Sequence, residues 1–397
     1  MSGVRDQYEA YPYPARDPAD EAARLITGSP SDPREMDHFL WQGRRDWSRP
    51  LRALVAGGGT GDGLIQLAQK LAWAGVACDI TYVDLSGAAR AVAEARAAAR
   101  GLQGITFVTG SLLEAPGLGR FDYIDCCGVL HHLPDPAEGF AALRAALAPG
   151  GGMGFMVYAP HGRSGVYPLQ EAFGALFEGL APHQRLARAR AVMAKLPAGH
   201  PFRRNPNLGD HLASDAGFYD LLLHSQDRAF AVEELLALLA ATGWALAGFA
   251  QGGLYDLARL AEVPEGMEAA RAMGLAERLR GTLKVHVGYA VAAGAGDSIA
   301  RPADRALVPH LAGGAAARVA QAVASGQPLP VKLAGTREAL VLPRKAAPLI
   351  AAIDGRRALG AIEARSGLDR IGFGALWAAV DRTLTPWGLL HYSGLRA

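Results

Sequence analysis

The chain has 397 residues with 40 basic and 38 acidic side chains, and its formal net charge is +2. This balance argues against a strongly basic nucleic-acid surface, and the length allows one large core plus a smaller domain. Its three cysteines contain no Cys-x-x-Cys pair, so we expect neither a disulfide framework nor a metal site. Without a signal-peptide pattern or an apolar run of membrane-spanning length, we expect a cytoplasmic protein.

Residues 1–50 precede the first predicted strand and are rich in tyrosine and proline. Tyr8 and the run Tyr11–Pro14 form a cluster that we expect not to be a regular helix, because proline disrupts helix interiors. Tyrosine rings offer flat apolar faces with a polar tip, so the segment suits packing as an arm against a larger domain or its ligand.

The segment 51–67 reads as a strand, a tight turn and a helix that begins at Leu64. Glycines fill the turn at positions 57, 58, 59, 61 and 63. Such a turn lets a ligand approach backbone N–H groups at a helix N-terminus. The dinucleotide pattern G-x-G-x-x-G fails because Asp62 stands at its third glycine position. An NAD-dependent oxidoreductase is therefore disfavoured, and the core also lacks a Tyr-x-x-x-Lys pair.

Further strands are expected at 79–85, 105–109, 123–127 and 152–158, with an amphipathic helix over 136–147. Alternating strands and helices predict a parallel sheet covered on both faces. Asp84 ends the second strand 23 residues after Gly61 (84 − 61), a spacing typical of an acidic residue that binds ribose hydroxyls. The alternative is that Asp84 merely caps the turn before Ser86.

The order of these motifs resembles the class I S-adenosylmethionine-dependent methyltransferases. The resemblance rests on G-x-G-x-G at Gly57, Gly59 and Gly61, on V-L-H-H-L at 129–133, and on L-x-P-G-G at 147–151. It implies an α/β, Rossmann-like, doubly wound seven-stranded sheet with a helical cap, and S-adenosylmethionine as cofactor. The implied cofactor-binding residues are Ala56, Gly57, Gly58, Gly59, Gly61, Asp84, Leu85, Gly110, Ser111, Leu112, Gly128 and Val129.

Two positions depart from the family pattern. Val55 stands where most members have an acidic residue at the end of the first strand, and Ser111 stands where many have aspartate. We expect Ser111 to hydrogen-bond in its place, and Asp62 to replace part of the missing charge.

The resemblance also implies where an acceptor binds. The arm of residues 1–50 would cover the cofactor and acceptor pocket. The catalytic candidates are His131, His132, Tyr158 and Arg163, and the candidates for the acceptor pocket are Tyr11, Tyr13, His161, Tyr167 and His224. The alternatives are that the two adjacent histidines cap a turn, and that His224 pairs with Asp220 one turn away on a helix surface.

The domain organisation is predicted from composition and periodicity. A methyltransferase domain is expected over 51–294, with a helical cap at about 161–228 and an insertion at about 254–280. Strands at 244–249 and 283–292 would be the antiparallel sixth and seventh strands. Residues 302–397 resemble a small, mainly helical winged-helix-like domain. The Tyr-Pro-Tyr-Pro run at 11–14 together with this domain resembles a bacterial subset of the superfamily.

The predicted function is methyl transfer to a small metabolite or to a protein or peptide side chain. The alternative is a catalytically silent cofactor-binding scaffold. The C-terminal domain would contact a peptide or protein, and no nucleic-acid or membrane partner is expected. The N/D-P-P-Y/F motif of amino-methylating nucleic-acid enzymes is absent after the fourth strand, where residues 127–130 read Cys-Gly-Val-Leu.

Overall fold

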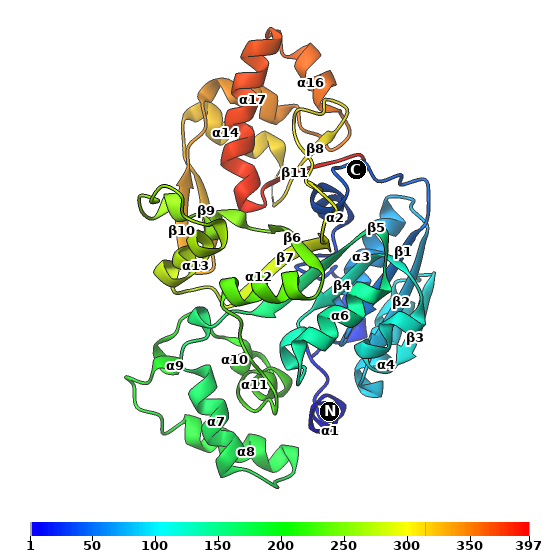
Figure 1. Ribbon diagram of the computed structural model, residues 1–397, viewed down its shortest axis with the longest axis vertical. Helices are drawn as coiled ribbons and strands as arrows, with labels where there is room; N and C mark the ends of the chain where they lie inside the picture. Colours follow the sequence, from blue (N-terminus) through cyan, green and yellow to red (C-terminus); the bar gives the residue numbers. More distant parts are fainter. Residues whose placement is uncertain (1, 314, 397) are drawn as a thin grey trace.

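The computed structural model describes residues 2–313 and 315–396. The predicted boundaries at residues 1 and 397, and position 314 within the last predicted domain, lie outside the described residues. A seven-stranded sheet forms the centre of the molecule, with the C-terminal helices above it and the cap below it in Figure 1. Within the described residues, no helix combines the length and apolar character needed to cross a bilayer.

The sheet has the strand order β3-β2-β1-β4-β5-β7-β6. The central strands β1 and β4 are buried at most positions because helices cover both faces of the sheet. Only β7 runs antiparallel to its neighbours β5 and β6, which closes the sheet as predicted. The strands are β1 Leu51–Ala56, β2 Cys78–Asp84, β3 Ile105–Thr109, β4 Phe121–Cys127, β5 Leu147–Tyr158, β6 Trp244–Phe249 and β7 Val285–Ala292.

Two apolar clusters fill the two faces of the sheet. One cluster packs α5, α6 and α12 against the sheet and continues into the C-terminal part of the chain, and the other packs α2, α3 and α4. The helices begin where the sequence places caps, as at Asp135 before α6 and Ser86 before α4. Their bounds are α2 Pro33–Leu40, α3 Asp62–Trp73, α4 Gly87–Ala99, α5 Ala115–Leu118, α6 Pro136–Ala146 and α12 Val232–Ala241.

The arm is more regular than its sequence suggests. Helix α1 covers Ser2–Ala10 and so includes Tyr8, which corrects the expectation that the whole tyrosine and proline cluster is non-helical. Proline excludes helix only from position 11 onward, where the chain bends, and a 3₁₀ turn η1 follows at Pro18–Ala22.

The cap and the insertion are helical. The cap has its own apolar cluster and lies beside α1 in Figure 1. The cap helices are α7 Val166–Leu176, α8 Pro182–Met193, α9 Pro201–Arg204, α10 Asp210–Ala213 and α11 Asp215–Leu222, and the insertion contains 3₁₀ turns at Gly252–Tyr255 and Leu257–Arg259 and helix α13 Ala269–Arg280.

The C-terminal part contains two small antiparallel sheets among helices. Strand β11 pairs with β8, and β9 pairs with β10 as a hairpin. A winged-helix-like character stays a prediction. The elements are β8 Val308–Leu311, α14 Ala316–Ser325, β9 Leu329–Leu333, β10 Thr336–Leu340, α15 Ala347–Ala351, α16 Leu359–Arg365, α17 Arg370–Leu384 and β11 Leu390–Ser393.

Candidate active site

At the glycine-rich turn after β1, the backbone of the turn lies against the backbone of the N-terminal arm. Gly57 and Gly61 have φ angles of +67° and +98°, a region that side chains disfavour. A Cβ on Gly59 would lie 2.8 Å from the carbonyl oxygen of Tyr13, so the arm rests directly on this turn. The hydroxyl of Thr60 fixes the same contact by donating to the carbonyl oxygen of Pro14 at 2.7 Å.

Asp84 lies at the carboxyl end of β2, beside this turn. Its carboxylate accepts hydrogen bonds of 2.8 Å from the backbone N–H groups of Gly59 and Ser86. Burial raises the pKa of Asp84, although these two N–H groups oppose the shift. The residue therefore organises the turn before Ser86 and also faces the ligand cavity.

A cavity of about 480 Å³ lies at the carboxyl ends of the strands. This volume is typical of small-molecule sites, which measure roughly 300–1,000 Å³. The predicted cofactor residues that line it are Ala56, Gly57, Gly58, Gly59, Asp84, Leu85, Gly110, Ser111, Leu112, Gly128 and Val129, whereas Gly61 is not on the lining. Ser111 also begins the next 3₁₀ turn, where its hydroxyl accepts from the N–H of Leu113.

The other end of the cavity is built around Asp220, a buried carboxylate on α11. Tyr8 donates to one of its oxygens at 2.9 Å, and Tyr158 donates to the other at 3.2 Å. Burial raises the pKa of Asp220. All three side chains line the cavity. This end therefore presents a carboxylate whose hydrogen-bond partners are neutral hydroxyl groups.

His132 and His224 stack beside this carboxylate, with ring centroids 3.8 Å apart. His132 Nδ1 lies 2.9 Å from the carbonyl oxygen of Gln226, so Nδ1 carries the proton and Nε2 has the lone pair. His224 has the opposite tautomer, because its Nδ1 accepts from the N–H of Gln226 and its Nε2 contacts the hydroxyl of Tyr8.

These tautomers bear on whether the cluster could hold a metal ion. His132, Asp220 and His224 bring one ligand atom each to within 4.8 Å of one another. However, Nδ1 of His224 is occupied by a backbone N–H and its Nε2 carries the proton. The arrangement is that of a hydrogen-bonded chain that runs from Gln226 through His224 to Tyr8 and Asp220.

Arg163 closes the cavity behind Tyr158. Its guanidinium lies 3.6 Å from the centroid of the Tyr158 ring and pairs with Asp227 at 2.8 Å. It also donates to the hydroxyl of Tyr167 at 3.0 Å. Asp227 neutralises the charge of the Arg163 guanidinium. We therefore assign Arg163 the role of holding the Tyr158 ring in place.

The remaining predicted site residues divide between the lining and its surroundings. Tyr13 lines the cavity, whereas Tyr11, His161, Tyr167 and His224 do not, and Tyr11 stacks on Tyr219 instead. His131 is fully buried behind the lining and stacks on Tyr158. Burial lowers the pKa of His131 well below its usual value, so the ring is neutral and serves packing.

The pairing of Asp220 and His224 also differs from the expectation. Helix α11 ends at Leu222, so His224 is not one helical turn beyond Asp220 on the same face. The two residues are linked through the hydroxyl of Tyr8.

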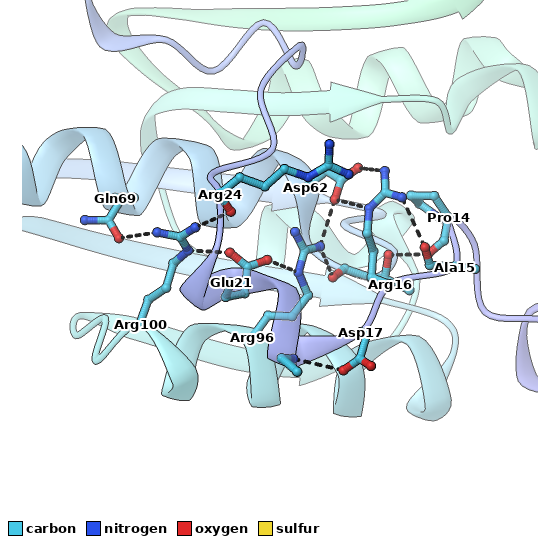
Figure 2. Close-up of polar contacts among 12 residues, drawn as sticks. Pro14, Ala15, Arg16, Asp17, Glu21, Arg24, Asp62, Gln69, Arg96 and Arg100 are labelled. Carbon is cyan, nitrogen blue, oxygen red and sulfur yellow. Dashed lines mark hydrogen bonds and ion pairs between the residues drawn. The ribbon is translucent and has the colours of Figure 1, made fainter.

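Sequence reasoning missed Arg16, which lines the cavity and ties the arm to α3. Figure 2 shows the network. Arg16 donates to both carboxylate oxygens of Asp62, at 2.9 and 2.6 Å, and Arg96 contacts the same carboxylate at 2.8 Å. Burial acts to raise the pKa of Asp62, but these two arginines lower it. Asp62 is thus neutralised within the protein, which corrects the expectation that its charge replaces the missing acidic residue at position 55.

The buried end of this network fixes the 3₁₀ turn η1 against α4. Glu21 accepts from Arg96 at 2.6 Å, and both side chains are almost completely buried. Arg100 pairs with the second oxygen of Glu21. Arg96 lies in an alanine-rich helix that also carries Arg90 and Glu94, so its sequence context does not distinguish it from a surface arginine.

Sequence reasoning also missed Asp125, a carboxylate inside the central strand β4 that lines the cavity. Its exposed fraction is 2%. An acidic residue within an apolar strand of a parallel sheet was the signal that could have found it, because such strands are buried on both faces.

Comparisons with known proteins agree with this geometry. Residues 54–153 match the family described as "Methyltransferase domain". An uncharacterized protein from Synechococcus sp. is 33% identical over 265 residues, which are 64% of this chain and 61% of that protein. The match thus spans less than two thirds of the relative's length.

Two solved structures share the fold. PKMT2 from Rickettsia typhi in complex with AdoHcy superposes with a TM-score of 0.60 at 13% identity, over 90% of this chain and 74% of that chain. A second structure of the same protein has a TM-score of 0.57 at 12% identity, with the same coverage. At this level of identity the likeness concerns the fold.

The strand order is that of the Rossmann-like class I methyltransferase fold, and the glycine turn and Asp84 at the tip of β2 line the cavity at its strand ends. Residues 54–153, which match a methyltransferase domain, lie within this fold, so the chain contains a methyltransferase domain.

Proposed function

We propose that the protein transfers the methyl group of S-adenosylmethionine to an acceptor bound beside Asp220. The acceptor is a small metabolite or a protein or peptide side chain. The observation that supports this most is that a single cavity is lined by Asp84 and also by Tyr158 and Asp220, so cofactor and acceptor would share one site. The cofactor supplies an already activated methyl group. The protein supplies orientation, which contributes about 7–11 kcal/mol in well-aligned reactions.

Each end of the cavity has its own task. Asp84 accepts hydrogen bonds from ribose hydroxyls, and the glycine turn offers backbone N–H groups. Asp220 binds the acceptor, with the hydroxyls of Tyr8 and Tyr158 holding its carboxylate in place. The lone pair on Nε2 of His132 receives the proton of an acceptor that arrives protonated.

Calorimetric titration with S-adenosylmethionine and S-adenosylhomocysteine tests the cofactor end. We expect micromolar binding that Asp84→Ala weakens more than tenfold, or about 1.4 kcal/mol. Asp79→Ala is the matched control, because Asp79 lies on the same strand and is exposed. Absence of binding by the wild-type protein would refute the proposal.

Transfer is then tested with methyl-labelled cofactor and cell extract separated into small molecules and macromolecules. Label in the first fraction identifies a metabolite acceptor, and label in the second identifies a polypeptide. Binding without transfer to either fraction would favour the alternative, a scaffold that binds the cofactor without turning it over.

A further inference from the structure

Strand β4 carries a carboxylate at the position that pairs with the end of β1, where β1 itself has none. Val55 occupies the family's usual acidic position, and it pairs in register with Asp125 on the neighbouring parallel strand. Both residues line the cavity. Asp62, the other acidic side chain near this point, is bound by Arg16 and Arg96. Asp125 is therefore the carboxylate in this part of the cavity lining that is left to bind a ligand.

The partners of Asp125 hold its position without neutralising it. Ser29 donates to its carboxylate at 2.8 Å, Ser31 donates to the same oxygen, and the N–H of Cys127 also contributes. Among the described residues, no Lys, Arg or His forms an ion pair with it. Burial raises the pKa of Asp125. A buried carboxylate with only neutral donors is suited to a ligand that brings a positive charge.

The position of Asp125 within the cavity indicates which positive group that is. Asp84 ends β2 and Gly110–Leu112 follow β3, both on one side of β1, and they form the adenosine end. Asp125 lies across β1, on β4, where a Cβ on Gly63 would come within 2.5 Å of its carboxylate. A ligand that runs from β3 over the tip of β1 thus brings its far end to Asp125. In the cofactor that far end is the amino acid part, whose ammonium group is positively charged.

We propose that Asp125 binds the ammonium group of the cofactor's amino acid part. Strand β4 thereby supplies the carboxylate that β1 lacks, and Ser29 and Ser31 hold it from the arm. The assignment rests on the cofactor site and is independent of the acceptor.

The test compares three probes by calorimetry: S-adenosylhomocysteine, its analogue with hydrogen in place of the amino group, and 5′-methylthioadenosine, which lacks the whole amino acid part. We expect Asp125→Asn to weaken binding of S-adenosylhomocysteine at least tenfold and that of the other two less than twofold. Asp122→Asn is the matched control, because Asp122 lies on the same strand and pairs with Arg52 outside the cavity. It should leave all three affinities unchanged.

Unchanged binding of S-adenosylhomocysteine by Asp125→Asn would overturn the assignment. An equal loss for all three probes would also overturn it, because it would reveal a structural role. If Asp125→Asn does not fold, the wild-type protein still decides: the deaminated analogue should bind at least tenfold more weakly than S-adenosylhomocysteine, and equal binding overturns the proposal. Failure of the wild type to bind any probe would instead refute the cofactor site.

Discussion

The hydroxyl of Tyr8 lies 2.9 Å from a carboxylate oxygen of Asp220, although 212 residues separate the two in sequence. Tyr8 belongs to the first helix and Asp220 to the last helix of the cap. This hydrogen bond joins the arm and the cap over the proposed acceptor end of the cavity.

Removing this hydroxyl should impair transfer more than cofactor binding. We expect Tyr8→Phe to lower the rate of methyl transfer at least tenfold, since a hydrogen bond to a charged group contributes about 1.5–3 kcal/mol. Affinity for S-adenosylhomocysteine should change less than twofold. The rate is measured with labelled cofactor and the fraction that accepts the label. Tyr11→Phe is the control, and a wild-type rate for Tyr8→Phe would contradict the assignment of this end of the cavity.

The ion pairs of Figure 2 should stabilise both the fold and the closed arm. Glu21→Gln leaves Arg96 buried without its carboxylate, and breaking a buried pair costs about 3–5 kcal/mol. We expect urea denaturation to show a loss of this size, together with weaker cofactor binding as the arm loosens. Glu94→Gln removes a surface partner of Arg90 and should cost less than about 0.5 kcal/mol. Equal losses for the two variants would contradict this account.

Buried histidines should make the fold sensitive to acid. Burial lowers the pKa values of His286, His310 and His391 to about 4. The unfolded chain gains these protons near pH 6.5 and the folded chain does not, so stability is lost as the pH falls from 6.5 towards 4. Each histidine should account for about 2 kcal/mol between pH 7 and 5.

Urea denaturation at the two pH values checks this dependence. His391→Gln should show a loss between pH 7 and 5 that is smaller by about that amount than in the wild type. The exposed His183 on α8 supplies the control variant His183→Gln, whose pH dependence should match the wild type. A wild-type pH dependence for His391→Gln would contradict the prediction.

A side chain at position 57 in the glycine turn should be unfavourable for two separable reasons. A Cβ on Gly57 would lie 2.5 Å from a methyl carbon of Val129, and its φ angle of +67° is unfavourable for other residues. We expect Gly57→Ala to lower the melting temperature and cofactor affinity. Adding Val129→Ala should recover the steric part and leave about 1–2 kcal/mol of backbone strain. If the double variant is no better than the single one, contact with Val129 is not the cause.

Much of the central fold was predictable because it depends on local patterns. Strands β3 and β6 match their predicted bounds, and β2, β4, β5 and β7 differ by one to five residues at one or both ends. Apolar runs, turn glycines and caps lie next to one another in sequence, so they can be recognised without the structure. The same applies to Asp84, whose spacing from the glycine turn follows from the βαβ unit.

The parts that were missed depend on distant contacts. Nothing beside Asp62 in the sequence shows that Arg16 and Arg96 neutralise it, and nothing beside Asp125 shows that two serines of the arm reach it. The pair of Asp220 and His224 was noticed on helical spacing, but their link is the hydroxyl of Tyr8. Side chains contributed from remote segments thus explain most of the differences at the site.

The last strand also completes the first part of the protein. Asp37 in α2 is buried, and its carboxylate accepts hydrogen bonds from the hydroxyl of Ser393 at 2.6 Å and from the N–H of Gly394 at 3.0 Å. During synthesis on the ribosome, Asp37 is made early, and more than 350 further residues must be added before these two donors exist. Helix α2 therefore reaches its final hydrogen bonding only after Ser393 and Gly394 have been synthesised, so the N-terminal part of the domain cannot complete its structure before strand β11 has been made.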